Sequence, residues 1–175
     1  MRSLFIVICI MLSSCVGVPE NIQPVSKFSL DRYLGTWYEI ARLDHSFERG
    51  LEQVTADYSL REDGGVKVIN RGFNSADKEW STAEGKAHFV KDSNTGHLKV
   101  SFFGPFYASY IIFDLGKNYE YSLVTSKDKS YLWLLSRTPT LNSELQKTLI
   151  DRMQNLGFST KDLIFVTQTK NNTAE

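Results

Sequence analysis

Short runs of alternating hydrophobic and polar residues, separated by turn-forming residues, recur through the middle of the chain. The run at 54–60 alternates cleanly and is followed by Asp63-Gly64, a step that is typical of β-hairpins. Similar runs lie at 37–41, 66–73, 80–90, 97–102, 106–115, 119–125 and 131–136. Because connections this short make each strand antiparallel to the one before it, the pattern predicts an all-β fold of eight antiparallel strands, either a sandwich or a barrel.

One later segment has a helical period instead. Its apolar residues form a single stripe, which consists of Leu141, Leu145, Leu149, Ile150, Met153 and Leu156. The spacing predicts an α-helix over about 142–156, ended by Gly157, with Thr140, Asn142 or Ser143 as its N-cap. Since the stripe has to be covered, we expect this helix to pack on the outside of the sheet. Residues 161–168 predict a ninth strand at an edge, and 169–175 a polar tail.

The N-terminus carries a targeting signal. Arg2 precedes a run of nine apolar residues at 4–12, which is typical of a secretory signal and too short to span a bilayer. The alternative is a buried N-terminal strand or helix. Leu12-Ser13-Ser14-Cys15 resembles the bacterial lipobox. That resemblance implies a signal peptide at 1–14 and a Cys15 that carries S-linked diacylglycerol and an N-acyl chain. Val16 favours the outer membrane, and residues 15–27, with Pro19 and Pro24, predict a lipidated tether.

Composition excludes several functions. Twenty basic and twenty acidic residues give zero net charge, which argues against a general nucleic-acid binder. Both cysteines, Cys9 and Cys15, lie in the first fifteen residues, so the body of the protein has no disulfide and no thiol nucleophile. The three histidines show no metal-ligand spacing, and the sequence lacks a G-x-S-x-G element. We therefore expect no metal, no cofactor and no catalytic residues.

Three motifs in order resemble those of the lipocalin family. Gly35-Thr36-Trp37 resembles the G-x-W signature at the start of the first strand, Tyr119-Glu120-Tyr121 the second motif, and Arg137 the arginine of the third. The resemblance covers about residues 28–168. It implies an eight-stranded up-and-down barrel in which Gly35, Trp37 and Arg137 form the closed floor, with the arginine stacked on the tryptophan. Longer phrases such as 37–42 and 134–139 are similar to bacterial outer-membrane lipoprotein lipocalins.

Strand alternation then assigns residues to the lumen, because side chains of equal parity share a face. An eight-stranded barrel is just wide enough to hold one small ligand. Glu39 is an expected inward carboxylate, available to a head group or to an ion pair near the floor. The full set expected to line a ligand pocket is Glu39, Ala41, Val54, Ala56, Tyr58, Ala87, Phe89, Val100, Phe102, Tyr131 and Trp133.

The resemblance implies a binding protein and not an enzyme. Its expected partners are a fatty acid or lysophospholipid in the barrel, and the outer membrane through the lipid anchor, with the barrel facing the periplasm. Its expected role is storage or transport of these lipids in membrane maintenance, particularly under stress. A lipid-modifying enzyme and a barrel scaffold for a protein partner are the alternatives. The aromatic run at 102–106 could form a homodimer interface or a membrane contact, and the sequence is compatible with both.

Overall fold

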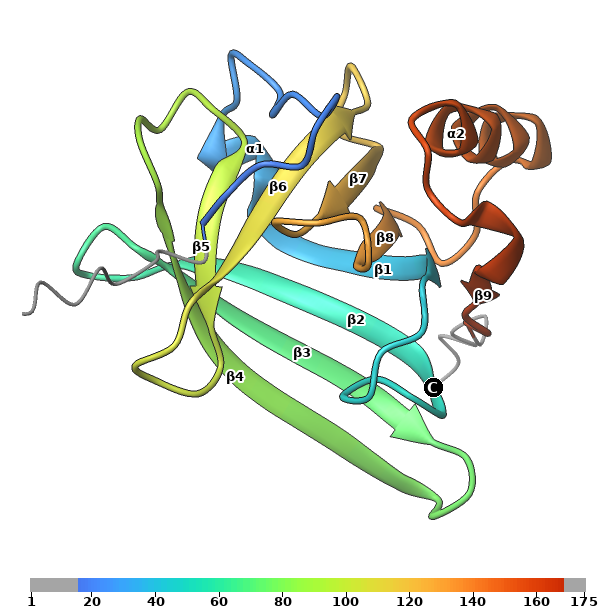
Figure 1. Ribbon diagram of the computed structural model, residues 1–175. Helices are drawn as coiled ribbons and strands as arrows, with labels where there is room; N and C mark the ends of the chain where they lie inside the picture. The colour runs from blue at the N-terminus through green and yellow to red at the C-terminus, as the bar shows by residue number, and fades with distance from the viewer. Residues whose placement is uncertain (1–15, 169–175) are drawn as a thin grey trace, which may run out of the picture.

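Eight antiparallel strands close on themselves in the computed structural model, which describes residues 16–168 (Figure 1). They are β1 (Gly35–Arg42), β2 (Leu51–Leu60), β3 (Val66–Asn74), β4 (Glu79–Phe89), β5 (His97–Ser101), β6 (Ala108–Leu115), β7 (Tyr121–Thr125) and β8 (Leu132–Ser136). Each strand pairs with the next, and β1 pairs with both β8 and β2. The predicted all-β class is confirmed, and closure decides for the barrel over the sandwich.

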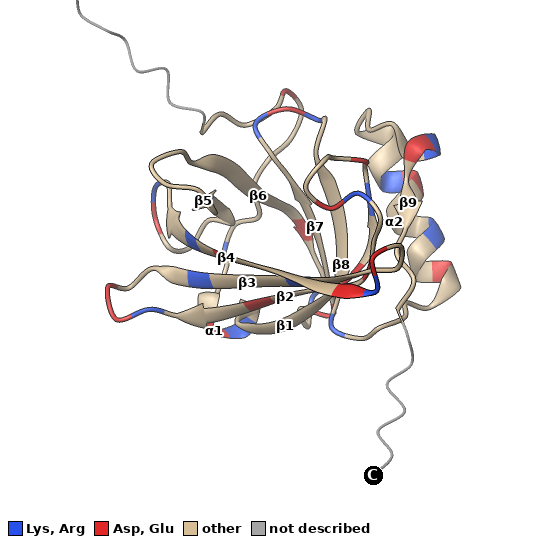
Figure 2. Cartoon of the chain, turned by 90° about the horizontal axis from the view of Figure 1, so that it is seen from below, with Lys and Arg blue, Asp and Glu red and all other residues tan. Residues whose placement is uncertain are grey.

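Helix α2 (Ser143–Asn155) covers one side of the barrel from outside (Figure 1). Asn142 is its N-cap, because its side-chain oxygen accepts hydrogen bonds from the backbone N–H groups of Glu144 and Leu145. Leu149 and Met153 are buried against Leu132 and Leu134 of β8. The opposite face of α2 carries charges of both signs (Figure 2). The expected outer position of the helix is therefore confirmed, and its packing forms the first apolar core.

The expected ninth strand is shorter than the sequence pattern suggests. A 3-10 helix, η1 (Thr160–Asp162), occupies the start of the segment, and only β9 (Ile164–Phe165) pairs with β1. β9 pairs with Ala41 and Arg42, past the residues of β1 that pair with β2. Hydrogen bonds after β9 also hold this segment, because Gln53 donates its N–H to the Thr167 carbonyl and the Gln168 side chain donates to the carbonyls of Glu39 and Val54.

A second apolar core fills one end of the barrel interior. The short helix α1 (Leu30–Tyr33) crosses that end and packs the Tyr33 ring against Trp37 of β1, with ring centroids 4.8 Å apart. Phe28 packs beside Tyr33, with their ring centroids 5.3 Å apart. Sequence periodicity did not predict α1, because four residues are too few to show a helical repeat. This end is closed, so access to the interior is from the opposite end, where the β1–β2, β3–β4, β5–β6 and β7–β8 loops lie.

Residues 16–27 have more structure than the tether expected from the sequence. Val25 donates its N–H to the carbonyl of Ile112 on β6 at 2.8 Å, and Ile22 is buried in the core beneath α2. Nearer its start, Gly17 accepts a hydrogen bond of 2.9 Å from the Ser109 hydroxyl. The segment therefore lies along β6 (Figure 1). The signal and lipidation assignments at residues 1–14 and Cys15 lie outside the described residues, as does the tail from residue 169.

Candidate ligand site in the barrel

The closed floor is built around Trp37 and Arg137. The Arg137 guanidinium carbon lies 3.9 Å from the centroid of the Trp37 ring, and Trp37 is fully buried. Trp37 Nε1 donates to the Tyr33 carbonyl at 2.8 Å, while Arg137 donates to the carbonyls of Thr36 and Arg32. Gly35 has a φ of +89°, a conformation that few residues with a side chain adopt. These contacts plug one end of the barrel.

Above this floor lies an open-ended cavity of about 830 Å³. Its wall is mainly apolar and aromatic, and its size lies in the range of small-molecule sites. Nine residues of the expected lumen set line it: Glu39, Val54, Ala56, Tyr58, Ala87, Val100, Phe102, Tyr131 and Trp133. They come from strands β1, β2, β4, β5 and β8 and from the segments that flank β5 and β8. The structure therefore brings these side chains together around one space.

Ala41 does not face this space, contrary to the expectation from strand parity. The register between β1 and β8 shifts between Glu39 and Ala41, so β1 contains a bulge there. The extra residue, Ile40, reverses the alternation. Ala41 then packs in the core beneath α2, and Arg42 takes the inward side next to Glu39. The assignment of Ala41 to the pocket is corrected accordingly.

Phe89 also lies outside the cavity, although it has the expected parity. It is the last residue of β4 and pairs with Leu98 of β5. The Phe28 ring meets it edge-on, with centroids 6.1 Å apart. Phe28 belongs to the segment that crosses the closed end, so Phe89 is part of the floor packing. The assignment of Phe89 to the pocket is therefore corrected.

A group of tyrosine hydroxyls lies deep in the cavity. Tyr110 OH is 2.9 Å from Tyr33 OH and 2.7 Å from Tyr58 OH, and Tyr33 OH is 3.1 Å from the Ser122 hydroxyl. Burial raises the pKa of Tyr33 to about 12, so these groups are neutral donors and acceptors. Sequence analysis identified only Tyr58 of this group. The partners come from α1, β2, β6 and β7, and no local motif could have brought them together.

A buried acid–base cluster lies in the wall nearer the mouth. Arg42 Nη1 donates to Glu39 Oε1 at 2.7 Å, and its Nη2 donates to the backbone carbonyl of Glu48, also at 2.7 Å. The Glu48 carboxyl lies in the same cluster, and its charge raises the pKa of Glu39. Arg42 supplies one positive charge, so the cluster is neutral when one of the two carboxyls carries a proton.

The protonation of this cluster follows from its burial. Desolvation raises the pKa of Glu39 to about 8, reinforced by Glu48 and opposed by Arg42. Burial also raises the pKa of Glu48, whose Oε2 accepts from Trp133 Nε1 at 3.0 Å. His45 Nε2 lies 3.2 Å from the same oxygen, and burial lowers the pKa of His45 to about 4. The imidazole is therefore neutral at physiological pH.

Residues 28–168 match the family model described as a lipocalin-like domain. The match extends from the segment at the closed floor to the end of the described chain, and it covers most of the protein. The protein is a lipocalin. The three motifs that resemble the family signatures in the sequence lie on β1, on the turn into β7 and after β8 in this fold.

Relatives of this lipocalin include bacterial lipoproteins. It is 54% identical over 170 residues to the outer membrane lipoprotein Blc of Vibrio cholerae. That alignment covers 96% of this chain and 99% of the relative. It is 49% identical over 150 residues to the protein of the same name from Escherichia coli K12, covering 86% and 85%. Among solved structures, insecticyanin of the tobacco hornworm Manduca sexta aligns with a TM-score of 0.70 at 19% identity, over 88% of both chains. That last likeness concerns the fold.

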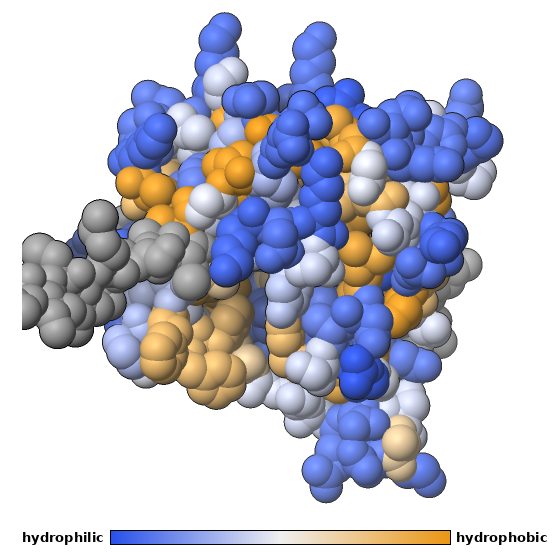
Figure 3. Space-filling model, in the orientation of Figure 1, coloured by the Kyte–Doolittle hydropathy of each residue, from blue (hydrophilic) through white to orange (hydrophobic). Residues whose placement is uncertain are grey.

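The open end of this lipocalin is bordered by exposed aromatic side chains. Phe103 and Phe106 in the β5–β6 loop are 80% and 79% exposed, and Phe47 in the β1–β2 loop is 57% exposed. All three line the cavity entrance. Figure 3 shows apolar surface gathered at the lower left, where Figure 1 places the β5–β6 loop. Sequence analysis found the aromatic run at 102–106 but could not assign its orientation.

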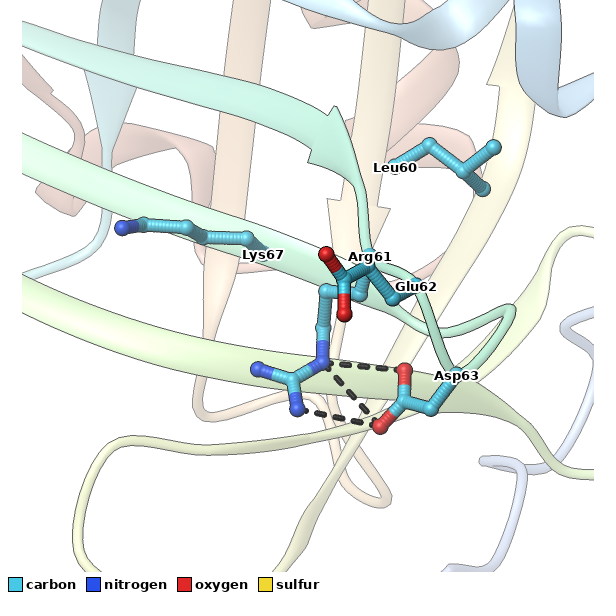
Figure 4. A pocket seen from close by; sticks show the side chains of 5 residues that line it. All are labelled: Leu60, Arg61, Glu62, Asp63 and Lys67. Carbon is cyan, nitrogen blue, oxygen red and sulfur yellow. Dashed lines mark hydrogen bonds and ion pairs between the residues drawn. The ribbon is translucent and has the colours of Figure 1, made fainter.

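A shallow hollow at the β2–β3 turn is a different kind of feature. It is formed by Leu60, Arg61, Glu62, Asp63 and Lys67 on the outside of the barrel (Figure 4). Arg61 and Asp63 hold each other through paired hydrogen bonds of 3.0 Å, as the dashed lines show. The Arg61 side chain thus already has a carboxylate partner, and the hollow lies at the closed end, away from the cavity.

A metal site or a membrane-spanning helix would be a further indication of function in the described part of the lipocalin. Within residues 16–168, no group of three or more His, Cys, Asp or Glu side chains could hold a metal ion. Over the same residues, no helix has the length and apolar character needed to cross a bilayer. The cavity is therefore the feature of this region from which a function can be argued.

Proposed function

We propose that this lipocalin is an outer-membrane lipoprotein that binds a fatty acid or lysophospholipid in its barrel. The observation that carries this proposal is the cavity of about 830 Å³, closed at the Trp37 floor and lined mainly by apolar side chains. Burying an acyl chain against such a wall contributes roughly 0.8 kcal/mol per methylene. A single-chain lipid suits a blind-ended barrel, because its tail can enter first and leave the head group at the mouth.

The chemistry of the wall supports a ligand whose inner part is uncharged. The Tyr110 hydroxyl bonds to Tyr33, and Arg42 donates to Glu39 and to the Glu48 carbonyl, which leaves only its Nε without a hydrogen bond to the described residues. A buried charge on the ligand would need a partner of opposite sign. An acyl tail needs none. The family is one of binding proteins, and we accordingly propose binding without turnover.

The location is proposed from two independent features. The relatives in Vibrio cholerae and Escherichia coli are named outer membrane lipoproteins. In this chain, Leu12-Ser13-Ser14-Cys15 ends an apolar run in the manner of a lipobox. We propose that residues 1–14 are cleaved and that Cys15 carries the acyl chains, with the barrel on the periplasmic side. Several acyl chains together give stable anchoring, whereas a single chain does not.

The finer roles also remain proposals. Storage or transport of single-chain lipids would contribute to membrane maintenance, particularly under stress. Homodimer formation stays a prediction from the aromatic run at 102–106.

Ligand binding is tested by native mass spectrometry of the freshly purified lipoprotein, followed by extraction and identification of bound lipid. A complementary assay displaces an acylated fluorophore with palmitic acid or palmitoyl-lysophosphatidylcholine. We expect one bound acyl lipid per barrel and displacement at micromolar concentration. An empty barrel together with no displacement by either lipid contradicts the proposal. Anchoring is tested separately, because Cys15→Ser should abolish labelling by radioactive fatty acid.

A further inference from the structure

The first observation concerns the rim of the cavity. Phe103 and Phe106 project from one loop and Phe47 from another, and each is more than half exposed to solvent. Exposed apolar side chains that border a ligand entrance are typical of surfaces that contact a membrane or another protein. Other large exposed apolar residues, such as Leu60 and Phe165, lie away from the cavity, at the end of β2 and on β9.

The second observation concerns where the N-terminal segment leaves the barrel. The Gly17 carbonyl accepts a hydrogen bond of 2.9 Å from Ser109, the second residue of β6. Ser109 directly follows the β5–β6 loop and itself lines the cavity. From there the chain runs toward the closed end, where the Val25 N–H bonds to Ile112. Gly17 is thus held on the side of the mouth.

Chain length connects these two observations. Cys15 precedes Gly17 by two residues, and two residues of polypeptide span at most about 7 Å. Lipid attached to Cys15 would therefore be tethered close to the loop that carries Phe103 and Phe106. Val18, the residue after Gly17, is a further exposed apolar side chain. An anchor of this length cannot place the closed end of the barrel against the membrane while Gly17 stays bound to Ser109.

We propose that the mouth of the barrel docks on the bilayer that holds the Cys15 anchor. Phe103 and Phe106 enter the lipid interface, and a single-chain lipid passes between the bilayer and the lumen without crossing bulk water. The proposal rests on the anchor described under the proposed function. It adds an orientation, a docking surface and a route of entry.

The surface charge favours apolar contact over electrostatic attraction. The chain has zero net charge, and basic and acidic residues are interspersed over the view in Figure 2. On the β1–β2 loop, Arg49 is paired with Asp44 at 2.6 Å. Aromatic and other apolar side chains are those that enter a membrane interface from a peripheral protein. A second copy of this chain is the other possible occupant, but continuity with the anchor favours the bilayer.

Docking is tested in full-length lipoprotein reconstituted into vesicles of phosphatidylethanolamine and phosphatidylglycerol. A tryptophan is introduced by Phe106→Trp, and in a matched control by Leu60→Trp at the closed end. Brominated phospholipids quench tryptophans within the bilayer. Relative to the wild-type protein, we expect added quenching and a blue-shifted emission for Phe106→Trp, and neither for Leu60→Trp. Equal quenching in the two variants, or none in either, overturns the proposal.

The route of entry is tested by transfer of a fluorescent fatty acid from donor vesicles. The double variant Phe103→Ser/Phe106→Ser is compared with Leu60→Ser/Phe165→Ser, which removes as many exposed apolar residues elsewhere. For each, the rate of transfer from vesicles is divided by the rate of uptake of the monomeric ligand from solution. We expect this ratio to fall several-fold in the first variant and to stay unchanged in the second. An unchanged ratio in both overturns the route.

These outcomes can be separated from failure of the proposed function. If the lumen binds no lipid, the transfer assay has no signal, yet quenching of Phe106→Trp still tests docking. If Cys15 is not lipidated, mass spectrometry of the N-terminus shows it before reconstitution, and the docking proposal falls with the anchor. If quenching is absent and Phe103→Ser/Phe106→Ser converts a dimer to a monomer in sedimentation, the rim is a contact between copies and the proposal is overturned.

Discussion

Arg42 donates a 2.7 Å hydrogen bond to Glu39, and both side chains are buried in the wall of the lumen. The guanidinium also donates to the backbone carbonyl of Glu48, whose carboxyl is a second acid in the same cluster. Ionising both carboxyls would leave an uncompensated negative charge away from water, which is costly. Protonation of this pair is therefore linked to folding.

The first prediction is that the free energy of unfolding falls as pH rises from about 7 to 8.5. An unfolded glutamate releases its proton near its ordinary pKa of 4.5, whereas burial keeps Glu39 protonated up to about pH 8. The folded state thus binds more protons in that window, and stability is lost as pH rises through it. Since one proton corresponds to about 1.4 kcal/mol per pH unit, the loss is at most about 2 kcal/mol.

At lower pH, His45 contributes a rise of stability with pH, opposite to the fall from Glu39. The expected net decline in stability therefore begins near neutral pH. Burial lowers the pKa of His45 from 6.5 to about 4, so the His45 contribution to stability rises with pH between these values and offsets the fall that Glu39 contributes there. Urea unfolding at a series of pH values measures the net slope. Glu39→Gln should flatten the decline above pH 7, and Glu62→Gln in the exposed β2–β3 turn should leave it intact. A decline that persists in Glu39→Gln contradicts the assignment.

The second prediction concerns the floor. Trp37→Ala should lower the free energy of unfolding by about 3–5 kcal/mol, as for other buried aromatic residues. The same change removes the ring on which Arg137 stacks at 3.9 Å. Trp80→Ala is the matched control, because Trp80 lies on the surface near the start of β4 and is half exposed. Its cost should be below about 1 kcal/mol. Equal costs in urea unfolding contradict the floor assignment.

The alternation of apolar and polar residues predicted most of the strands, and it predicted side-chain orientation best where the strands are regular. On β8, alternation assigned Trp133 to the lumen. In the structure Trp133 and Leu135 share the inward face, while Leu132 and Leu134 face the helix. Both faces of this strand are apolar, which a strand with one face in solvent would not be. The outer apolar face is the one that the apolar stripe of the helix covers. These relations are local in sequence and follow from fixed periods.

The same rule failed at Ala41, because the bulge at Ile40 has no sequence signature. Arg42 was not assigned to the lumen because unbroken alternation from Glu39 places it on the outer face, and the same bulge turns it inward. Other features depended on long-range contact. Phe89 has the correct parity, but Phe28 covers it from the segment before β1, whose conformation follows no period. Residues that meet only after the barrel closes could not be paired from the sequence.

The third prediction concerns the hydroxyl group of Tyr110. Tyr110→Phe removes its hydrogen bonds to Tyr33 and Tyr58 while keeping the ring. Among the described residues, the Tyr58 hydroxyl bonds only to Tyr110, so this buried hydroxyl loses its partner. We expect a loss of about 1–3 kcal/mol in the free energy of unfolding, the cost of an unsatisfied buried polar group. Tyr107→Phe, in the neighbouring loop, is the control. A neutral Tyr110→Phe would show that another group satisfies Tyr58.

The fourth prediction tests how far a ligand's tail reaches into the barrel. Ala56 pairs with Trp37 across β1 and β2 and lines the cavity directly above the floor. Ala56→Leu should displace about two methylenes of a long acyl chain, at roughly 0.8 kcal/mol each, which corresponds to on the order of tenfold weaker binding. An octanoyl chain, which stops short of the floor, should bind as it does to the wild type.

Fluorophore displacement by palmitoyl- and octanoyl-lysophosphatidylcholine measures this difference. Ser59→Leu is the matched control, because Ser59 lies on the same strand with the opposite parity and is exposed to solvent. It adds the same side chain on the outside of the barrel. If Ala56→Leu weakens both ligands equally, the substitution has disturbed the barrel as a whole. If it weakens neither, the acyl tail does not reach the floor formed by Trp37, and the ligand is held nearer the mouth.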